Sequence, residues 1–377
     1  MKDRKRQLFT GNFCFGLSGI CAISSGVMVN LLQQMHGFSY SVTGTLLSCM
    51  NIGNMAASFA AGILPSKIGT RNTVAILCSG YFLGYLLMAG TGSVGLLMAA
   101  FLMVGLAKGC TINNCTVLVG NNSPDRAKGM TLMHAFYACG ALICPFLITA
   151  SAALGTAASM LTISLAGLAL WSLFMSAKLP GKPTGESKKE SADFSFLRSG
   201  KFWLLTGLLF CQNAAETSVT GWLVTYYKDQ QILSGLFSAY TVTIMWAATL
   251  IGRLLIAFVF KIKNTFKAVC LMGFGCTVLY ALMVHTQQPL LAVILLFAFA
   301  FSIAGVNPMA VAGTGKAMTA ASMGVMLPMA SLGAIIMPWI IGQVADLAGL
   351  QTGMFCNLIP CVGMMILSAV IFLKKLA

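Results

Sequence analysis

Residues 178–201 read KLPGKPTGESKKESADFSFLRSGK and lie midway along the 377-residue chain. The segment is charged and contains Pro, Gly and Ser, which is the composition of a linker. The sequence on both sides is strongly apolar: 58% of all residues are hydrophobic and only 8% are charged, against roughly 25% in a soluble domain. We therefore predict two domains, 1–177 and 202–377, joined by a linker over 178–201.

Apolar stretches long enough to cross a bilayer follow one another through both domains. A spanning helix needs about 20 predominantly apolar residues, and we count six such stretches before the linker and six after it. The predicted spans are roughly 9–30, 40–64, 72–92, 94–119, 130–151, 156–177, 202–226, 234–259, 266–285, 288–311, 318–342 and 352–373. The sequence therefore predicts an all-α integral membrane protein with twelve transmembrane helices.

The basic residues indicate how the chain is oriented. With the N-terminus inside the cell, 20 of the 23 Lys and Arg residues fall on cytoplasmic segments. Lys228 alone lies outside, while Lys108 and Arg253 fall within helices. We predict a multi-pass protein of the cell (inner) membrane with both termini and the linker in the cytoplasm. The net charge of +15 then reflects topology and contact with the lipid bilayer, and no nucleic-acid partner is needed to explain it.

The two halves carry the same residue types at matching positions. A displacement of 199 aligns the second span with the eighth, and one of 193 aligns the fourth and fifth spans with the tenth and eleventh. The aligned pairs are Gly53 with Gly252, Asn54 with Arg253, Asn114 with Asn307, Gly140 with Gly333, and Pro145 with Pro338. We infer an internal duplication that gives two pseudo-symmetric six-helix bundles.

A short motif between the second and third spans resembles a known family. Residues 62–71 read GILPSKIGTR, which resembles the loop signature of major facilitator superfamily transporters. The residues that match this signature are Gly62, Lys67, Gly69 and Arg71. Ser66 stands where the family usually has Asp. The resemblance implies gating or structural roles for the four matching residues, and a major facilitator fold with its substrate site between the halves.

Longer stretches resemble the fucose permease-like branch of that superfamily, which contains proton- or sodium-coupled sugar transporters. They are residues 126–145, 214–227, 251–255 and 333–346. In this branch the seventh helix carries an acid that matches Glu216 and an aromatic residue that matches Trp222. Trp222 and Tyr226 could stack on a sugar ring, or they could belong to the interfacial aromatic belt. Acids that fucose permease carries in its first and fourth helices have no counterpart here.

Glu216 is the only acidic residue that cannot be placed in a loop or at a helix end. Charge at such depth is costly and usually functional. Steps of three and four residues put Gln212, Glu216, Thr220 and Tyr227 on one helical face, with Asn213 beside it. Because lipid offers polar groups no partners, this stripe should face a central cavity, where we predict that Gln212, Asn213 and Glu216 bind substrate. The alternative is hydrogen bonding that only holds the bundle together.

Three polar residues outside the seventh span are further candidates. Lys108 near the middle of the fourth span either pairs with Glu216, is neutral, or extends to the surface. Asn114 and Asn307 are pseudo-symmetric amides that we predict to bind substrate, and the sequence Asn307-Pro308 should interrupt its helix. Arg253 lies close to the cytoplasmic end of its span, where we predict a structural or gating role, as we do for the aligned Pro145 and Pro338.

These features predict a secondary active transporter that moves a small polar solute, expected to be a sugar, by alternating access. Glu216 would be the acid that couples this movement to a cation, expected to be a proton rather than sodium, and Lys108 is predicted to take part in the coupling. Two alternatives stay open: a proton-driven exporter of drugs or metabolites, since residues 139–145 partly resemble an antiporter signature, and a non-transporting nutrient sensor on the same fold. Enzymatic motifs are absent, and the 13 Cys residues form no metal-type cluster. We expect a monomer without cofactor or metal.

Overall fold

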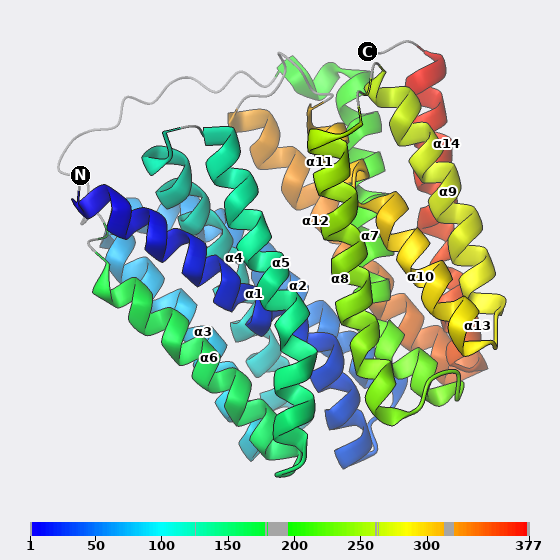
Figure 1. The fold of residues 1–377 in the computed structure, drawn as a ribbon, viewed down its shortest axis with the longest axis horizontal. Helices are drawn as coiled ribbons and strands as arrows, with labels where there is room; N and C mark the ends of the chain where they lie inside the picture. Colours follow the sequence, from blue (N-terminus) through cyan, green and yellow to red (C-terminus); the bar gives the residue numbers. More distant parts are fainter. Residues whose placement is uncertain are drawn as a thin grey trace. The chain divides into compact units, whose positions relative to one another are not determined.

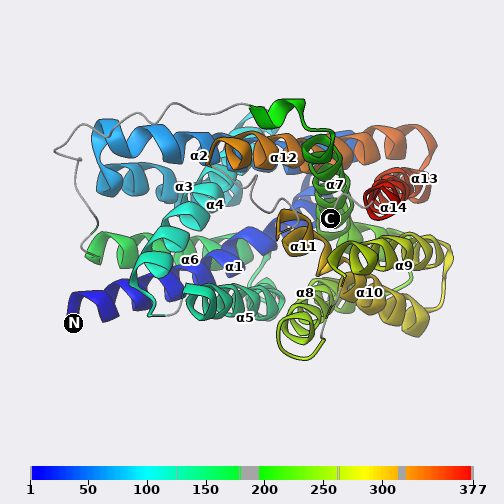
Figure 2. The same ribbon diagram turned by 90° about the horizontal axis from the view of Figure 1, so that it is seen from above.

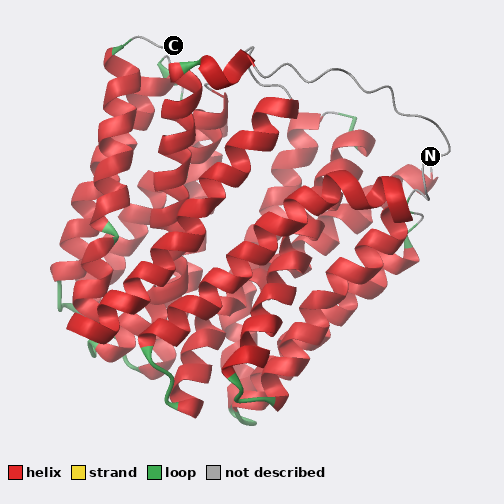
Figure 3. Cartoon of the chain, turned by 180° about the vertical axis from the view of Figure 1, so that it is seen from behind, coloured by secondary structure: helices red, strands yellow, loops and turns green. Residues whose placement is uncertain are grey.

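The computed structural model describes residues 2–124, 126–177, 179, 195–260, 262, 264–312 and 320–374, so most of the predicted linker lies outside the described residues. The part that it describes contains helices and connecting loops, and no strand (Figure 3). The chain divides into two compact units. The N-terminal unit comprises Met1–Phe38 and Thr45–Lys188, and the C-terminal unit comprises Ser39–Gly44 and Lys189–Ala377. The boundary at 188/189 falls inside the predicted linker.

One helix corresponds to each of the first six predicted spans, and all six lie in the N-terminal unit except residues 40–44 of the second, which belong to the C-terminal unit (Figure 1). The six helices are α1 (Lys2–His36), α2 (Tyr40–Ile68), α3 (Thr70–Gly90), α4 (Val94–Asn122), α5 (Arg126–Ala152) and α6 (Thr156–Ser176). α1 packs against α4, α5 and α6, and α3 packs against α4 and α6. α1 begins seven residues before the apolar stretch that predicted it, because the polar residues ahead of that stretch are also helical.

The C-terminal unit contains the remaining six spans, two of them in two pieces (Figure 1). Its elements are η1 (Ser195–Arg198), α7 (Gly200–Asp229), α8 (Gly235–Phe258), α9 (Thr265–His285), α10 (Pro289–Ile303), α11 (Val306–Ala312), α12 (Ala320–Ala348), α13 (Leu350–Cys356) and α14 (Leu358–Leu373). α10 with α11 forms one span, and α13 with α14 forms another. Within this unit α7 packs against α8, α12 and α14 (Figure 2).

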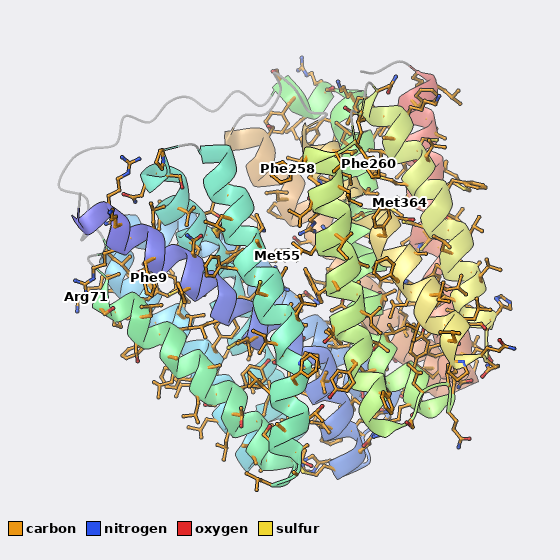
Figure 4. The ribbon with its side chains drawn as sticks, in the orientation of Figure 1. Phe9, Met55, Arg71, Phe258, Phe260 and Met364 are labelled. Atoms are coloured by element: carbon orange, nitrogen blue, oxygen red, sulfur yellow. The ribbon has the colours of Figure 1, made fainter. Side chains whose placement is uncertain are left out.

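The surface of these helices suits a lipid environment. Ten helical stretches among the described residues are long and apolar enough to cross a membrane; α2 and α7 are not among the ten, and α7 carries the polar stripe. Large apolar side chains are exposed, as with Leu290 at 74%, Ile359 at 71% and Phe258 at 71%, the last of which is labelled in Figure 4. Because soluble monomers rarely expose extended apolar surface, the prediction of a twelve-helix integral membrane protein is confirmed.

Two aligned glycines make equivalent contacts within the two units. A Cβ placed on Gly140 of α5 would lie 1.9 Å from the carbonyl oxygen of Gly16 on α1. A Cβ placed on Gly333 of α12 would lie 2.2 Å from the carbonyl oxygen of Phe210 on α7. Each glycine therefore lets the fifth helix of its half approach the first helix of that half closely, which is the geometry expected of a duplication.

The loop signature depends on one glycine with an unusual backbone. Gly69 joins α2 to α3 with a φ of 84°, a value that L-residues with a side chain rarely adopt. Its N–H donates to the carbonyl of Pro65 at 3.0 Å, and its own carbonyl accepts from the hydroxyl of Thr73 at 2.9 Å. Lys67 and Arg71 are exposed on either side of this turn. Gly62 lies inside α2, and the gating role of the signature stays a prediction.

Candidate functional site

A network of three polar side chains joins α7 to α11 inside the C-terminal unit. The Nε2 of Gln212 donates to the Oε2 of Glu216 one turn further along α7. The Nδ2 of Asn307 on α11 donates to the Oε1 of Gln212 at 3.0 Å. Gln212 is only 1% exposed, whereas Glu216 and Asn307 are half-buried. The structure thus brings together three of the residues predicted to bind substrate.

The other polar residues of α7 surround this network without joining it. The hydroxyl of Thr220 donates to the backbone carbonyl of Glu216 at 2.8 Å and approaches the Sδ of Met245 on α8 at 3.5 Å. Cys276 on α9 lies within electrostatic range of the Glu216 carboxyl. Asn213 is half-buried on the neighbouring face of α7. Its predicted contact with substrate stays a prediction.

The direction of the hydrogen bonds ties the network to the protonation state of Glu216. An ionised carboxylate only accepts hydrogen bonds, so it fixes the Gln212 amide with its nitrogen toward Glu216 and its oxygen toward Asn307. A protonated Glu216 gains an O–H donor, for which the present orientation of the Gln212 amide provides no acceptor. Protonation would thus add a donor at Glu216, while its other carboxyl oxygen could still accept a hydrogen bond from the Nε2 of Gln212.

Asn307 follows a helix break whose cause is clear. Pro308 has no N–H and cannot bond the carbonyl of Ala304, four residues earlier, and the helix is interrupted between Ile303 and Val306 as predicted. The Nε of Arg253 on α8 donates to this Ala304 carbonyl at 3.4 Å. Arg253 therefore helps to satisfy the broken end of α10, a structural role close to the network. A gating role for Arg253 stays a prediction.

Two aromatic residues of α7 contribute to packing. Trp222 is 0% exposed, and its Nε1 donates to the carbonyl of Pro338 in α12 at 3.1 Å. Tyr226 is also 0% exposed, and its hydroxyl donates to the carbonyl of Val284 on α9 at 2.9 Å. Neither ring presents a face on which a sugar could stack in this arrangement. The predicted contact of Trp222 with substrate stays a prediction.

The polar candidates of the N-terminal unit lie on α4. The Nδ2 of Asn114 donates to the carbonyl of Cys110 at 2.8 Å, and Asn114 lines a pocket inside this unit. Lys108 is half-buried on the same helix. Its pairing with Glu216, and a shared cavity for Asn114 with the amides of the other unit, stay predictions. Pro145 lies inside α5, as Pro338 does inside α12.

Sequence reasoning missed a cluster at the start of α2. The carboxylate of Asp346 in α12 accepts hydrogen bonds from the backbone N–H groups of Tyr40 at 2.7 Å and Ser41 at 2.9 Å, and from the Ser41 hydroxyl. The Tyr40 hydroxyl donates to Asp229 at the end of α7. All four residues belong to the C-terminal unit. Asp346 thus acts as an N-cap supplied by a distant helix, satisfying backbone donors that would otherwise lack partners.

Long apolar helices with an acid–amide network inside one unit define a polytopic membrane transporter. The chain belongs to the Major Facilitator Superfamily, whose family model matches residues 8–338. It is therefore a transporter and not an enzyme. Among the residues that the structure describes, no three His, Cys, Asp or Glu side chains are grouped so that they could hold a metal ion.

Relatives and solved structures agree with the family. The glucose transporter GlcP of Staphylococcus epidermidis is 26% identical over 132 residues, which is 34% of this chain and 29% of that relative. A mutant of the nucleoside transporter NupG superposes with a TM-score of 0.79 at 14% identity, covering 97% of this chain and 100% of NupG. A bacterial homologue of the human lysosomal transporter Spinster, in its inward-facing and occupied conformation, superposes with a TM-score of 0.75 at 11% identity. The match covers 100% of this chain and 97% of the homologue. At these identities the solved structures show the fold alone.

Proposed function

We propose that this protein is a secondary active transporter that moves a sugar across the cell membrane together with a proton. The observation that carries the proposal is the hydrogen-bonded series Asn307–Gln212–Glu216. Amides and carboxylates are the groups that hydrogen-bond sugar hydroxyls, because they offer donors and acceptors in fixed directions. The partial match to a glucose transporter supports a sugar as the solute.

Glu216 supplies the coupling in this proposal. A half-buried acid within an apolar unit takes up or releases a proton at an energetic cost that depends on its hydration and its partners. Alternating access changes both, so the proton affinity of Glu216 differs between the inward-open and outward-open states. A ligand shifts a conformational equilibrium only through such differential affinity. Proton binding and sugar binding at adjoining groups are therefore linked.

A ligand-stabilisation screen of the purified protein tests the choice of solute. Sugars, organic acids and lipophilic cations are compared by the shift that each causes in the thermal unfolding temperature. We expect saturable stabilisation by one or more sugars, followed by uptake of the same sugar into proteoliposomes. Stabilisation by lipophilic cations alone would favour the exporter, and saturable sugar binding without flux would favour the sensor.

Gln212→Met is expected to weaken sugar binding about tenfold or more. Met keeps the volume of Gln but removes both hydrogen bonds, which leaves Glu216 without its amide donor and Asn307 without its acceptor; a loss of about 1–3 kcal/mol corresponds to roughly that factor. Isothermal titration with the sugar identified in the screen measures the effect. Thr206→Val is the matched control, since the Thr206 hydroxyl donates only to the Phe202 carbonyl one turn earlier on α7. If the two variants bind the sugar with equal affinity, Gln212 is not part of the sugar-binding site.

The predicted topology is tested by labelling introduced cysteines in intact cells with a membrane-impermeant maleimide. Gln288→Cys, in the exposed connection between α9 and α10, is expected to react from outside. Ser187→Cys, in the linker outside the described residues, is expected to react only after the cells are opened. The parent protein is labelled in parallel because its Cys139 is exposed. Labelling of position 187 from outside would show that the chain has the opposite orientation in the membrane.

A further inference from the structure

The N-terminal unit contains a pocket of about 270 Å³ at the end where α1 and α3 begin and α4 ends. This is several times the share of liquid volume of one water molecule, about 30 Å³. Its polar lining residues are Gln7, Thr70, Asn114, Asn121 and Asn122. Val117, Leu118 and Leu179 complete the lining, and Asn121 is exposed.

Two of these amides present acceptors. The Nδ2 of Asn114 donates to the carbonyl of Cys110, and the Nδ2 of Asn122 donates to the carbonyl of Leu118, each at 2.8 Å. These bonds orient each amide, and the Oδ1 atom of each is an acceptor that a ligand can use. A molecule that carries hydroxyl donors satisfies such oxygens.

None of the described residues that line the pocket is basic, but Arg4 contacts one of them, and two further arginines lie near lining residues in the sequence. The Nε of Arg4 donates to the carbonyl of Asn122 at 2.6 Å, one helical turn before Gln7 on α1, and Arg6 donates to the carbonyl of Ser176. In these contacts both guanidinium groups donate to neutral carbonyls, which do not neutralise their charge. Arg71, labelled in Figure 4, is exposed at the start of α3 directly after Thr70.

We propose that this pocket binds a phosphorylated polyol. Its hydroxyl groups donate to the Oδ1 atoms of Asn114 and Asn122, and its phosphate accepts hydrogen bonds from the guanidinium of Arg4. The chemistry is shared by a soluble sugar phosphate and by the phosphoglycerol headgroup of a membrane lipid. The pocket is lined by residues of the N-terminal unit, whereas the acid–amide network on α7 belongs to the C-terminal unit, and Asn114 is also one of the residues predicted to bind the transported solute.

The full-length protein in detergent is titrated with glycerol 3-phosphate while its thermal unfolding is followed. We expect saturable stabilisation, with a smaller effect of inorganic phosphate and none of glycerol. Nanodiscs of phosphatidylglycerol are compared with nanodiscs of phosphatidylcholine to identify the source. Stabilisation by the free compound assigns the site to a soluble ligand, and stabilisation only by phosphatidylglycerol assigns it to a lipid headgroup.

Arg4→Gln and Asn122→Ala are each expected to raise the half-saturating concentration about tenfold, the effect of losing one charge-assisted or well-placed hydrogen bond. Arg198→Gln is the control, since Arg198 is an exposed basic residue of the C-terminal unit. If neither glycerol 3-phosphate nor phosphatidylglycerol stabilises the protein, or if Arg198→Gln weakens the response as much as Arg4→Gln does, the proposal is wrong.

Discussion

Glu216→Gln is expected to abolish accumulation of the transported sugar under an imposed pH gradient, while exchange of the sugar across the membrane continues in part. Gln keeps the shape of the side chain and can still meet the Gln212 amide, but it cannot bind and release a proton. A gradient of one pH unit supplies about 1.4 kcal/mol per proton, which corresponds to about tenfold accumulation for one proton per sugar. We expect this ratio to fall to one in proteoliposomes that contain the variant.

Asp229→Asn is the matched control for this experiment. It makes the same chemical change at the end of the same helix, where Asp229 accepts a hydrogen bond from Tyr40 and takes no part in the network around Gln212. We expect it to accumulate sugar as the parent does. If Glu216→Gln still concentrates the sugar normally under the pH gradient, Glu216 is not the coupling site, and sodium coupling or uniport becomes the preferred mechanism.

The spans could be predicted because apolarity is a local property of the sequence. The ends of the helices were less predictable: the predicted eleventh span ended at residue 342, whereas α12 continues to Ala348. The last turns include Asp346, a charged residue beyond the apolar stretch that predicted this span. Its role as a cap for α2 joins positions 306 residues apart, and no local pattern carries that information.

The candidate site was predictable where it followed helical periodicity. The spacing of four residues indicated that Gln212 and Glu216 share a face, and the structure shows them hydrogen-bonded. The place of Asn307 depended on the duplication and on the helix break, and the structure shows it bonded to Gln212. Trp222 was assigned to substrate through a resemblance. Sequence could not show that a backbone carbonyl of α12 lies beside its indole nitrogen.

Gly140→Ala and Gly333→Ala are both expected to destabilise the protein strongly. In each variant the new methyl group would overlap a backbone carbonyl oxygen of the facing helix, and a backbone cannot move aside as a flexible side chain does. Overpacking of this kind costs about 1–3 kcal/mol and sometimes more. We expect lower yields of monodisperse protein and lower unfolding temperatures for both variants, because the duplication places the same close approach in both units.

Gly95→Ala provides the control, since a Cβ at this exposed position of α4 would meet no atom within 4 Å. Ala is favoured over Gly in a helix by about 1 kcal/mol, so this variant should be as stable as the parent or slightly more stable. The difference between the control and the two test variants therefore isolates the cost of overlap from the change in helix propensity. If Gly140→Ala unfolds at the same temperature as Gly95→Ala, α5 does not approach α1 as closely in solution as in the structure. If Gly140→Ala lowers the unfolding temperature and Gly333→Ala does not, the close approach of helices exists only in the N-terminal unit. That result would contradict equivalent packing in the two halves.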